Sequence, residues 1–150
     1  MKTYAVFNDY FFKNNHWWIP KKLKRVICNR SNPRSKDYMN SLLKEKFPDV
    51  EIIGINNINN TENVEKIILL YPDSIGLGWS NLEKEIIKNY NVIEVLNGRK
   101  RHFKLSKEVR IELLFKRFLE ITFLPEILFT PVLIIYGIFL HIKHKIFGSA

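Results

Sequence analysis

Hydrophobic residues are arranged in two different ways along the chain. Residues 121–142 are almost wholly apolar, whereas the residues before them alternate short apolar runs with polar and charged segments. A helix of about 22 residues, rising about 1.5 Å per residue, can cross a hydrocarbon core of about 30 Å. The pattern predicts one N-terminal domain followed by a membrane attachment.

The apolar stretch contains features that disfavour a straight span. Pro125 and Pro131 each remove a backbone donor and kink or break a helix, and Glu126 is ionisable. Basic residues flank both ends, and the positive-inside bias would keep both ends in the cytoplasm. Two interpretations stay open: a Pro-broken helix that spans the membrane once, and a broken, re-entrant or interface-lying hairpin. A buried helix of a soluble core is the third, but little other chain is available to cover it.

Before this stretch the pattern is that of an α/β domain. Strands are predicted at residues 4–7, 51–55, 66–71 and 92–96, with the short apolar run 26–28 as a further candidate. Helices are predicted at residues 35–47, capped by Ser35, and at 80–89. The run 66–71 is the most apolar and should form a central, buried strand. The alternation predicts a small Rossmann-like, mainly parallel sheet with layered helices, and the short connection before residue 66 leaves an antiparallel step open there.

A basic amphipathic helix is predicted between this domain and the apolar stretch. Within residues 106–120, five apolar side chains recur at the spacing of one helical face: Ile111, Leu114, Phe115, Phe118 and Leu119. Charged residues lie on the other face, and such a helix should lie in the headgroup layer. The alternatives are a helix packed on the sheet with a solvated face, and a nucleic-acid-binding arm. The predicted domains are therefore 1–104, 105–120 and 121–150.

Basic residues gather in and before this helix. Asn97-Gly98 predicts a tight hairpin turn whose second arm is basic. Each basic side chain near an anionic membrane contributes about 1 kcal/mol to binding. We expect seven of them to face lipid headgroups or a lipid phosphate: Arg99, Lys100, Arg101, Lys104, Arg110, Lys116 and Arg117.

Composition narrows the class of partner. The net charge of +9 implies an anionic partner, either lipid, nucleic acid or a phosphorylated substrate, and the adjoining apolar stretch favours lipid over nucleic acid. A single cysteine, Cys28, excludes an internal disulfide framework. The sequence starts without a basic segment and a long apolar run, so we expect no cleavable signal peptide. Together with the basic flanks, this predicts that the main domain faces the cytoplasm.

Five aromatic residues lie close together near the start of the chain. They are Tyr10, Phe11, Phe12, Trp17 and Trp18, and a basic run follows them. They could form an interfacial aromatic belt, stack on sugars or bases, or fill the core of a small domain. The sequence leaves these three alternatives open.

The loop after the predicted central strand is the sharpest local motif. Gly76 and Gly78 would let backbone amides approach an anion, and a helix start follows at Ser80 and Asn81. Because ligands of open α/β sheets bind at the carboxyl ends of strands, these four residues form the predicted phosphate or nucleotide-sugar site. Asn81 stands where a dinucleotide fingerprint has its third glycine, and there is no Walker loop. The alternative is a capping box made by Ser80 and Glu83.

No cluster of catalytic residues is evident from the sequence. Asp73 could bind a ribose or a metal or act as a base, although an aspartate at this position can also cap a turn. Glu126 is the other candidate, since a carboxylate in a membrane is costly, unless it lies at the interface at a helix start. His141 and His144 have no carboxylate or cysteine beside them, so no metal site is predicted. No cofactor is evident, and a divalent metal is expected only for a transferase.

The stretches LLYPDSIGLGWSNLEKEI and VLNGRKRHFKLSKEVRIELLFKRFLE, with the Pro-containing apolar tail, carry a resemblance. Across about residues 66–142 the chain resembles small membrane-associated proteins of bacterial surface-polysaccharide gene clusters. The resemblance implies a role near glycosyl or sugar-phosphate transfer onto a lipid carrier, with a nucleotide-sugar or a polyprenyl phosphate as ligand. It also implies a location at the bacterial inner membrane. It transfers no catalytic residue.

Three functions are therefore carried forward. The first is a membrane-bound component of surface-glycan assembly, either a small transferase or its accessory subunit. The second is a non-catalytic, membrane-tethered adaptor that recruits or oligomerises a partner enzyme. The third is a membrane-acting effector or regulator that senses a ligand.

Overall fold

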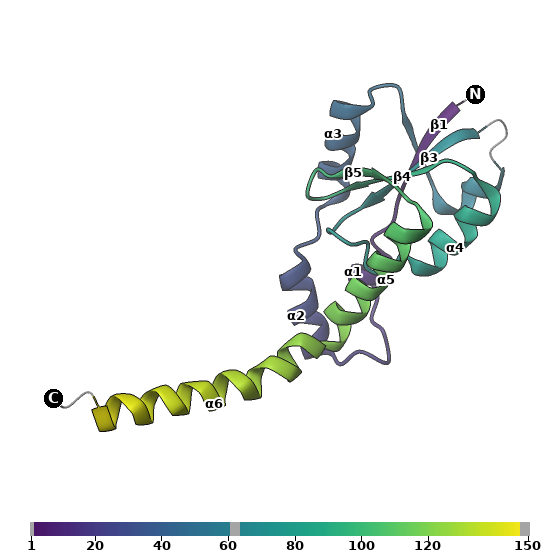
Figure 1. The fold of residues 1–150 in the computed structure, drawn as a ribbon. Helices are drawn as coiled ribbons and strands as arrows, with labels where there is room; N and C mark the ends of the chain where they lie inside the picture. The colour runs from purple at the N-terminus through teal and green to yellow at the C-terminus, as the bar shows by residue number, and fades with distance from the viewer. Residues whose placement is uncertain (1, 61–63, 148–150) are drawn as a thin grey trace. The chain divides into compact units, whose positions relative to one another are not determined.

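The computed structural model describes residues 2–60 and 64–147 (Figure 1). The chain divides into two units, Met1–Arg117 and Phe118–Ala150. The first unit is a mixed α/β domain and the second is helical. Each unit is described by itself below.

Unit 1 is built on a five-stranded, mostly parallel sheet. Its strands are β1 (Lys2–Phe7), β2 (Glu51–Ile53), β3 (Val64–Tyr71), β4 (Ile93–Asn97) and β5 (His102–Lys104). Their order across the sheet is β2-β1-β3-β4-β5, and only β5 is antiparallel to its neighbour (Figure 1). The prediction of a central strand at 66–71 is confirmed, because β3 has paired strands on both sides.

The antiparallel step left open before residue 66 is not present. Strands β2 and β3 do not pair with each other; both pair in parallel with β1, which lies between them. The connection crosses β1 through a short 3₁₀ helix, η1 (Ile55–Asn60). Ile58 of this helix is buried in the core and so secures the short crossover.

Helices cover both faces of the sheet (Figure 1). Helix α3 (Lys36–Lys46) packs Met39, Leu42 and Leu43 on one face, and Ser35 caps it by accepting the Tyr38 N–H at 3.2 Å, as predicted. Helices α4 (Ser80–Asn89) and α5 (Lys107–Thr122) contribute Ile86 and Leu113 to the core on the other face. Because successive strand residues point to opposite faces, the part of a strand that is covered on both must be apolar, as β3 is from Ile67 to Tyr71.

The interpretation of residues 26–28 as a strand is wrong. Two helices follow β1, α1 (Tyr10–Lys13) and α2 (Lys21–Ser31), and the apolar run lies inside α2. Three successive residues of a helix point in three directions, so Ile27 is fully buried while Val26 is half-exposed. Such a short apolar run carries no periodicity that separates strand from helix.

The hairpin predicted from Asn97-Gly98 is confirmed. Strand β4 turns into β5 there, and the Asn97 side-chain oxygen accepts the N–H groups of Arg99 and Arg101, each at 3.0 Å. Gly98 is required by a close approach, because a Cβ atom at this position would lie 2.3 Å from the Pro72 carbonyl oxygen. The hairpin is thereby fastened to the loop that follows β3.

Unit 2 contains one long apolar helix, α6 (Leu124–Phe147). Its segment Leu124–Lys145 is long and apolar enough to cross a membrane. The re-entrant hairpin is contradicted, because the chain does not reverse direction within this helix. The helical path of the chain is interrupted at Phe123, whose φ is 53°. Pro125 lies in the first turn of α6, where a backbone N–H would have no carbonyl partner within the helix, so the proline costs no hydrogen bond there. Pro131 lies inside the helix without ending it.

Candidate functional site

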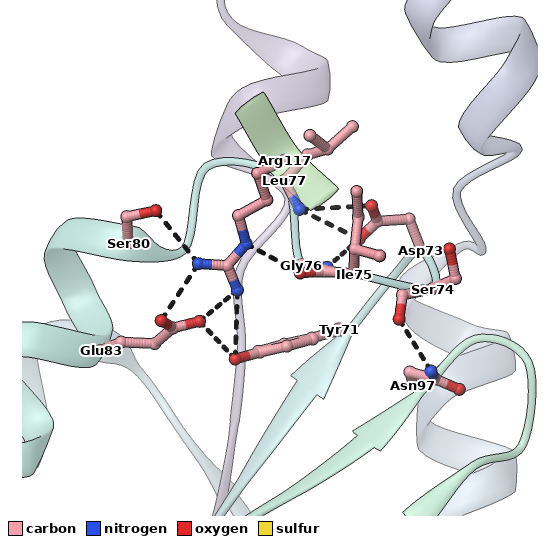
Figure 2. A network of polar contacts seen from close by, with 10 residues as sticks. All are labelled: Tyr71, Asp73, Ser74, Ile75, Gly76, Leu77, Ser80, Glu83, Asn97 and Arg117. Atoms are coloured by element: carbon pink, nitrogen blue, oxygen red, sulfur yellow. Dashed lines mark hydrogen bonds and ion pairs between the residues drawn. The ribbon is translucent and has the colours of Figure 1, made fainter. Parts of the chain in front are cut away.

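The loop between β3 and α4 lies at the carboxyl edge of the sheet, where ligands of open α/β sheets bind (Figure 2). It is held by its neighbours on two sides. The Asn97 side-chain N–H donates to the Ser74 carbonyl at 2.9 Å, and the Gly98 N–H donates to the Tyr71 carbonyl at 2.9 Å. The ends of β3 and β4 are therefore joined by direct hydrogen bonds.

Asp73 organises the inside of this loop. Its carboxylate is only 1% exposed and accepts the N–H of Gly76 at 2.8 Å and that of Leu77 at 3.2 Å. Burial raises the pKa of the Asp73 carboxyl, and the hydrogen bonds from Leu77 and Gly76 partly offset this. The arrangement is the turn-capping alternative for Asp73. The amide of Gly76, assigned from sequence to a phosphate, is thus engaged by the protein's own carboxylate.

Replacing Asp73 with alanine should destabilise the domain by about 1–3 kcal/mol, because two N–H groups would lose their acceptor. Asp73→Asn should cost less than half of that loss, since the amide oxygen can accept both hydrogen bonds and no buried charge remains. Chemical denaturation of the full chain in detergent micelles measures both. If the two variants lose equal stability, the carboxylate has a role other than capping the turn.

The two loop glycines are required by packing. Both have positive φ angles, 70° at Gly76 and 80° at Gly78. A Cβ atom at Gly76 would lie 2.6 Å from the Tyr71 ring, and one at Gly78 would lie 2.6 Å from the Cβ of Phe11. A bulky residue at Gly76 would therefore disturb the fold as well as any ligand, so it is a poor probe of binding. Asn81 is exposed on α4.

Arg117 forms a buried network that sequence reasoning missed (Figure 2). Its Nη1 donates to Ser80 Oγ and Glu83 Oε2, each at 3.0 Å, and its Nε donates to the Ile75 carbonyl at 2.8 Å. Its Nη2 donates to Glu83 Oε1 and, at 3.4 Å, to the hydroxyl of Tyr71, which itself donates to Glu83. These bonds use all five N–H donors of the guanidinium. We call Arg117, Glu83, Tyr71 and Ser80 the Arg117 network.

The Arg117 network corrects two predictions. Arg117 was expected to face lipid headgroups, but it is 4% exposed and pairs with Glu83, which is fully buried. The capping box is also wrong: Trp79 precedes α4 without a side-chain cap, Ser80 accepts from Arg117, and Glu83 turns inward. The only signal available was the spacing of Val109, Leu113 and Arg117, which places the arginine on one helical face with two apolar residues.

Charge is retained inside this network. Burial lowers the pKa of Arg117, but the hydrogen bonds and charge of Glu83 outweigh it, so the net pKa is raised. Burial and the neighbouring Glu83 carboxylate raise the pKa of Tyr71 well above its usual value. At neutral pH the raised pKa values keep Tyr71 protonated and Arg117 charged, which suits a structural role better than proton exchange.

A pocket of about 440 Å³ opens beside the network, within the size range of small-molecule sites. It lies between the β3–α4 loop, the hairpin and the part of α5 in unit 1. Its lining has apolar, polar and charged groups, with two cations and one carboxylate: Ser74, Ile75, Asn97, Arg101, Phe103, Val109, Glu112, Leu113 and Lys116. The pocket thus combines an apolar wall with a surplus of positive charge.

The remaining predicted residues are spread over the chain. The four basic residues of the hairpin region, Arg99, Lys100, Arg101 and Lys104, are exposed, and of these Arg101 lines the pocket. Lys116 is exposed, pairs with Glu112 and also lines the pocket. Arg110 is half-buried. Glu126 lies in the first turn of α6, the position expected of an interfacial helix start. The structure therefore brings two of the predicted basic residues to one pocket.

Within the described ranges, no three His, Cys, Asp or Glu side chains gather in a way that could hold a metal ion. Comparisons with protein-family models, with curated proteins and with solved structures give no match. The candidate site therefore rests on its own geometry, and the resemblance to surface-polysaccharide proteins stays a prediction.

Proposed function

We propose that this chain is a membrane-attached α/β protein that binds a small amphiphilic anion in the pocket at the carboxyl edge of its sheet. The observation that carries the proposal is the lining of that pocket, where Arg101 and Lys116 lie with the apolar side chains of Phe103, Val109 and Leu113. Arginine and lysine recognise phosphate, and the apolar side chains suit the body of the same ligand.

The sheet supports this placement of the site. The order β2-β1-β3-β4, with all four strands parallel and helices on both faces, agrees with a Rossmann-like arrangement. In such sheets, loops at the carboxyl ends of the strands hold the ligand, chiefly beside the point where the strand order reverses, which here lies between β1 and β3. Here Ser74 and Ile75 follow β3, Asn97 ends β4, and all three line the pocket.

The length and composition of α6 support attachment to a membrane. A domain held at a bilayer meets phosphate chiefly on lipid headgroups and lipid carriers. The ligand class we favour is therefore a polyprenyl phosphate or a nucleotide-sugar, which agrees with a role in or beside sugar-phosphate transfer to a lipid carrier at the bacterial inner membrane.

Binding can be tested with the full chain in detergent micelles, using farnesyl phosphate, glucose 1-phosphate and UDP-glucose as probes in calorimetry. We expect farnesyl phosphate or UDP-glucose to bind, and Arg101→Ala to weaken binding about 10- to 100-fold, as for loss of a hydrogen bond to a charged group. The matched control is Lys104→Ala, which removes a basic residue of the same hairpin outside the pocket. Equal affinities in the two variants, or no binding by any probe, would refute the proposed site.

A second candidate function, a membrane-tethered adaptor, is favoured by one observation. On the part of α5 in unit 1, Ile111, Leu114 and Phe115 form an exposed apolar stripe, and Phe115 is 60% exposed. A contiguous apolar surface of this kind is typical of a contact with a partner or a membrane. Loss of a copurifying transferase subunit in Phe115→Ser, with farnesyl phosphate binding unchanged, would favour the adaptor.

A further inference from the structure

The turn between α1 and α2 presents two tryptophans to solvent. Trp17 is 97% exposed and Trp18 is 50% exposed, whereas Phe11 before them and Ile19 after them are buried. A tryptophan that packs in a core or an interface buries about 150–250 Å². We call residues 14–20 the Trp loop, and its tip leaves most of that apolar area in water.

A ring contact and two hydrogen bonds support the Trp loop on its buried side. The His16 ring stacks on Phe11 with 5.1 Å between ring centroids, and the Ile19 N–H donates to the His16 carbonyl at 3.1 Å. Lys24, which is largely buried in α2, donates from its ammonium to the Asn14 carbonyl. The turn that carries the exposed tryptophans is therefore held by contacts within unit 1.

Three exposed basic residues follow the Trp loop. Helix α2 starts directly after it, and its first two turns expose Lys21, Lys22 and Arg25. Tryptophan beside lysine and arginine is the composition of segments that lie at the surface of an anionic bilayer. Lysine is depleted at protein–protein interfaces, which makes a protein partner a poorer match for the same surface.

The Trp loop also lies at the edge of unit 1 from which the chain leaves toward α6. Phe11, on which the loop rests, packs against Gly78. Arg117, the last residue of unit 1, donates to the carbonyl of Ile75 in the same β3–α4 loop. Residues 75–78 therefore contact both Phe11, which supports the Trp loop, and Arg117, after which the chain enters unit 2.

We propose that unit 1 docks on an anionic bilayer through the Trp loop together with Lys21, Lys22 and Arg25. This contact is additional to α6 and does not rest on the identity of the pocket's ligand. The tryptophans enter the interface between headgroups and acyl chains, and the three basic residues face anionic headgroups. Docking holds the carboxyl edge of the sheet against the membrane, so the loop that contributes Ser74 and Ile75 to the pocket lies near the headgroup layer.

Tryptophan fluorescence tests the contact in the full chain. The protein is placed in nanodiscs of phosphatidylcholine, with or without phosphatidylglycerol, and bromine-labelled lipids serve as quenchers. The chain has three tryptophans, and the third, Trp79, is fully buried, so lipid quenching reports on Trp17 and Trp18. The double variant Trp17→Phe and Trp18→Phe should remove the quenchable signal.

We expect strong lipid quenching in anionic discs and little in neutral ones. Lys21→Gln with Lys22→Gln should weaken docking about 25-fold, at about fivefold for each lysine near an anionic surface. The matched control is Lys84→Gln with Lys88→Gln, which removes the same charge from exposed positions of α4 and should leave quenching unchanged.

Two results would overturn the proposal. Absence of lipid quenching, with Trp17 and Trp18 still open to the aqueous quencher acrylamide, would show that unit 1 stays off the bilayer. Protection from both quenchers that increases with the number of chains per disc would show that a second copy covers the surface. Lipid quenching of Trp17 and Trp18 is measured without farnesyl phosphate or UDP-glucose, so a failure of the proposed pocket can be told apart from a failure of docking.

Discussion

Replacing Arg117 with methionine should lower the free energy of unfolding by about 3–5 kcal/mol, the cost of removing one partner of a buried ion pair. Glu83 is fully buried, so the substitution would leave its carboxylate in the interior without its cationic partner. Ser80 and the Ile75 carbonyl would lose their donor as well. The measurement is urea denaturation of the full chain in detergent micelles, followed by circular dichroism.

Two further variants make this prediction specific. Lys116→Met removes the neighbouring cation, whose pair with Glu112 is exposed and four residues apart, and should cost about 0.5 kcal/mol or less. Glu83→Leu combined with Arg117→Met should recover much of the loss, because apolar residues often replace a buried ion pair without penalty. If Arg117→Met is as stable as Lys116→Met, or more stable, the Arg117 network does not stabilise the packing of α5 on the domain.

Placing two lysines in α6 should release the chain from membranes. Ile134 and Ile138 are exposed on this helix, and a lysine at the centre of a spanning helix costs about 2.5–3.5 kcal/mol, or about 5–7 kcal/mol for two. The double variant Ile134→Lys and Ile138→Lys should therefore move from the carbonate-resistant membrane fraction to the soluble fraction. Immunoblotting of both fractions measures the shift.

The control for α6 is Ile134→Leu with Ile138→Leu, which keeps the helix apolar and should stay in the membrane fraction. Unchanged fractionation of the lysine variant would mean that α6 does not cross the hydrocarbon core. A third outcome, with the lysine variant released by carbonate but bound to anionic vesicles at neutral pH, would agree with docking through the Trp loop.

The parts of the fold that could be predicted are those decided by local sequence. The apolar run of β3, the Ser35 cap of α3 and the Asn97-Gly98 turn each carry their signal within a few residues. Each of these elements was confirmed. Strand order is different: nothing local shows that β1 lies between β2 and β3, because that arrangement depends on pairings far apart in the chain.

Helix α5 shows why part of the candidate site could not be predicted. Periodicity identifies residues that share a helical face, and it grouped Ile111 with Phe115 and placed Arg117 on the other face. It does not say which face the domain covers. The structure buries Leu113 and Arg117 and leaves Ile111 and Phe115 exposed. Arg117 pairs with Glu83, 34 residues away, and no spacing rule links two residues at that distance.

The candidate phosphate site shows a related limit. Glycines after a central strand fit a loop that binds an anion, and they fit equally a loop that binds its own aspartate. The difference lies in where the Asp73 side chain points, and that depends on the fold around it. Arg101 and Lys116 were assigned to lipid from their charge and the adjoining apolar stretch, and only the structure places them in one pocket with Ser74.

The position of β1 has a consequence for the order in which the domain can fold during synthesis. Ribosomes release β1 before its two partners, and the central pair β1–β3 cannot form until the chain has been made through Tyr71. Until then Ala5 and Val6, which become fully buried, can pair only with the short strand β2. Pairing across so long a separation is also slow. The nascent chain is therefore most prone to aggregate before β3 has been made. The hydrogen bonds of Arg117 to Ile75 and Glu83 form only when α6 begins to leave the ribosome.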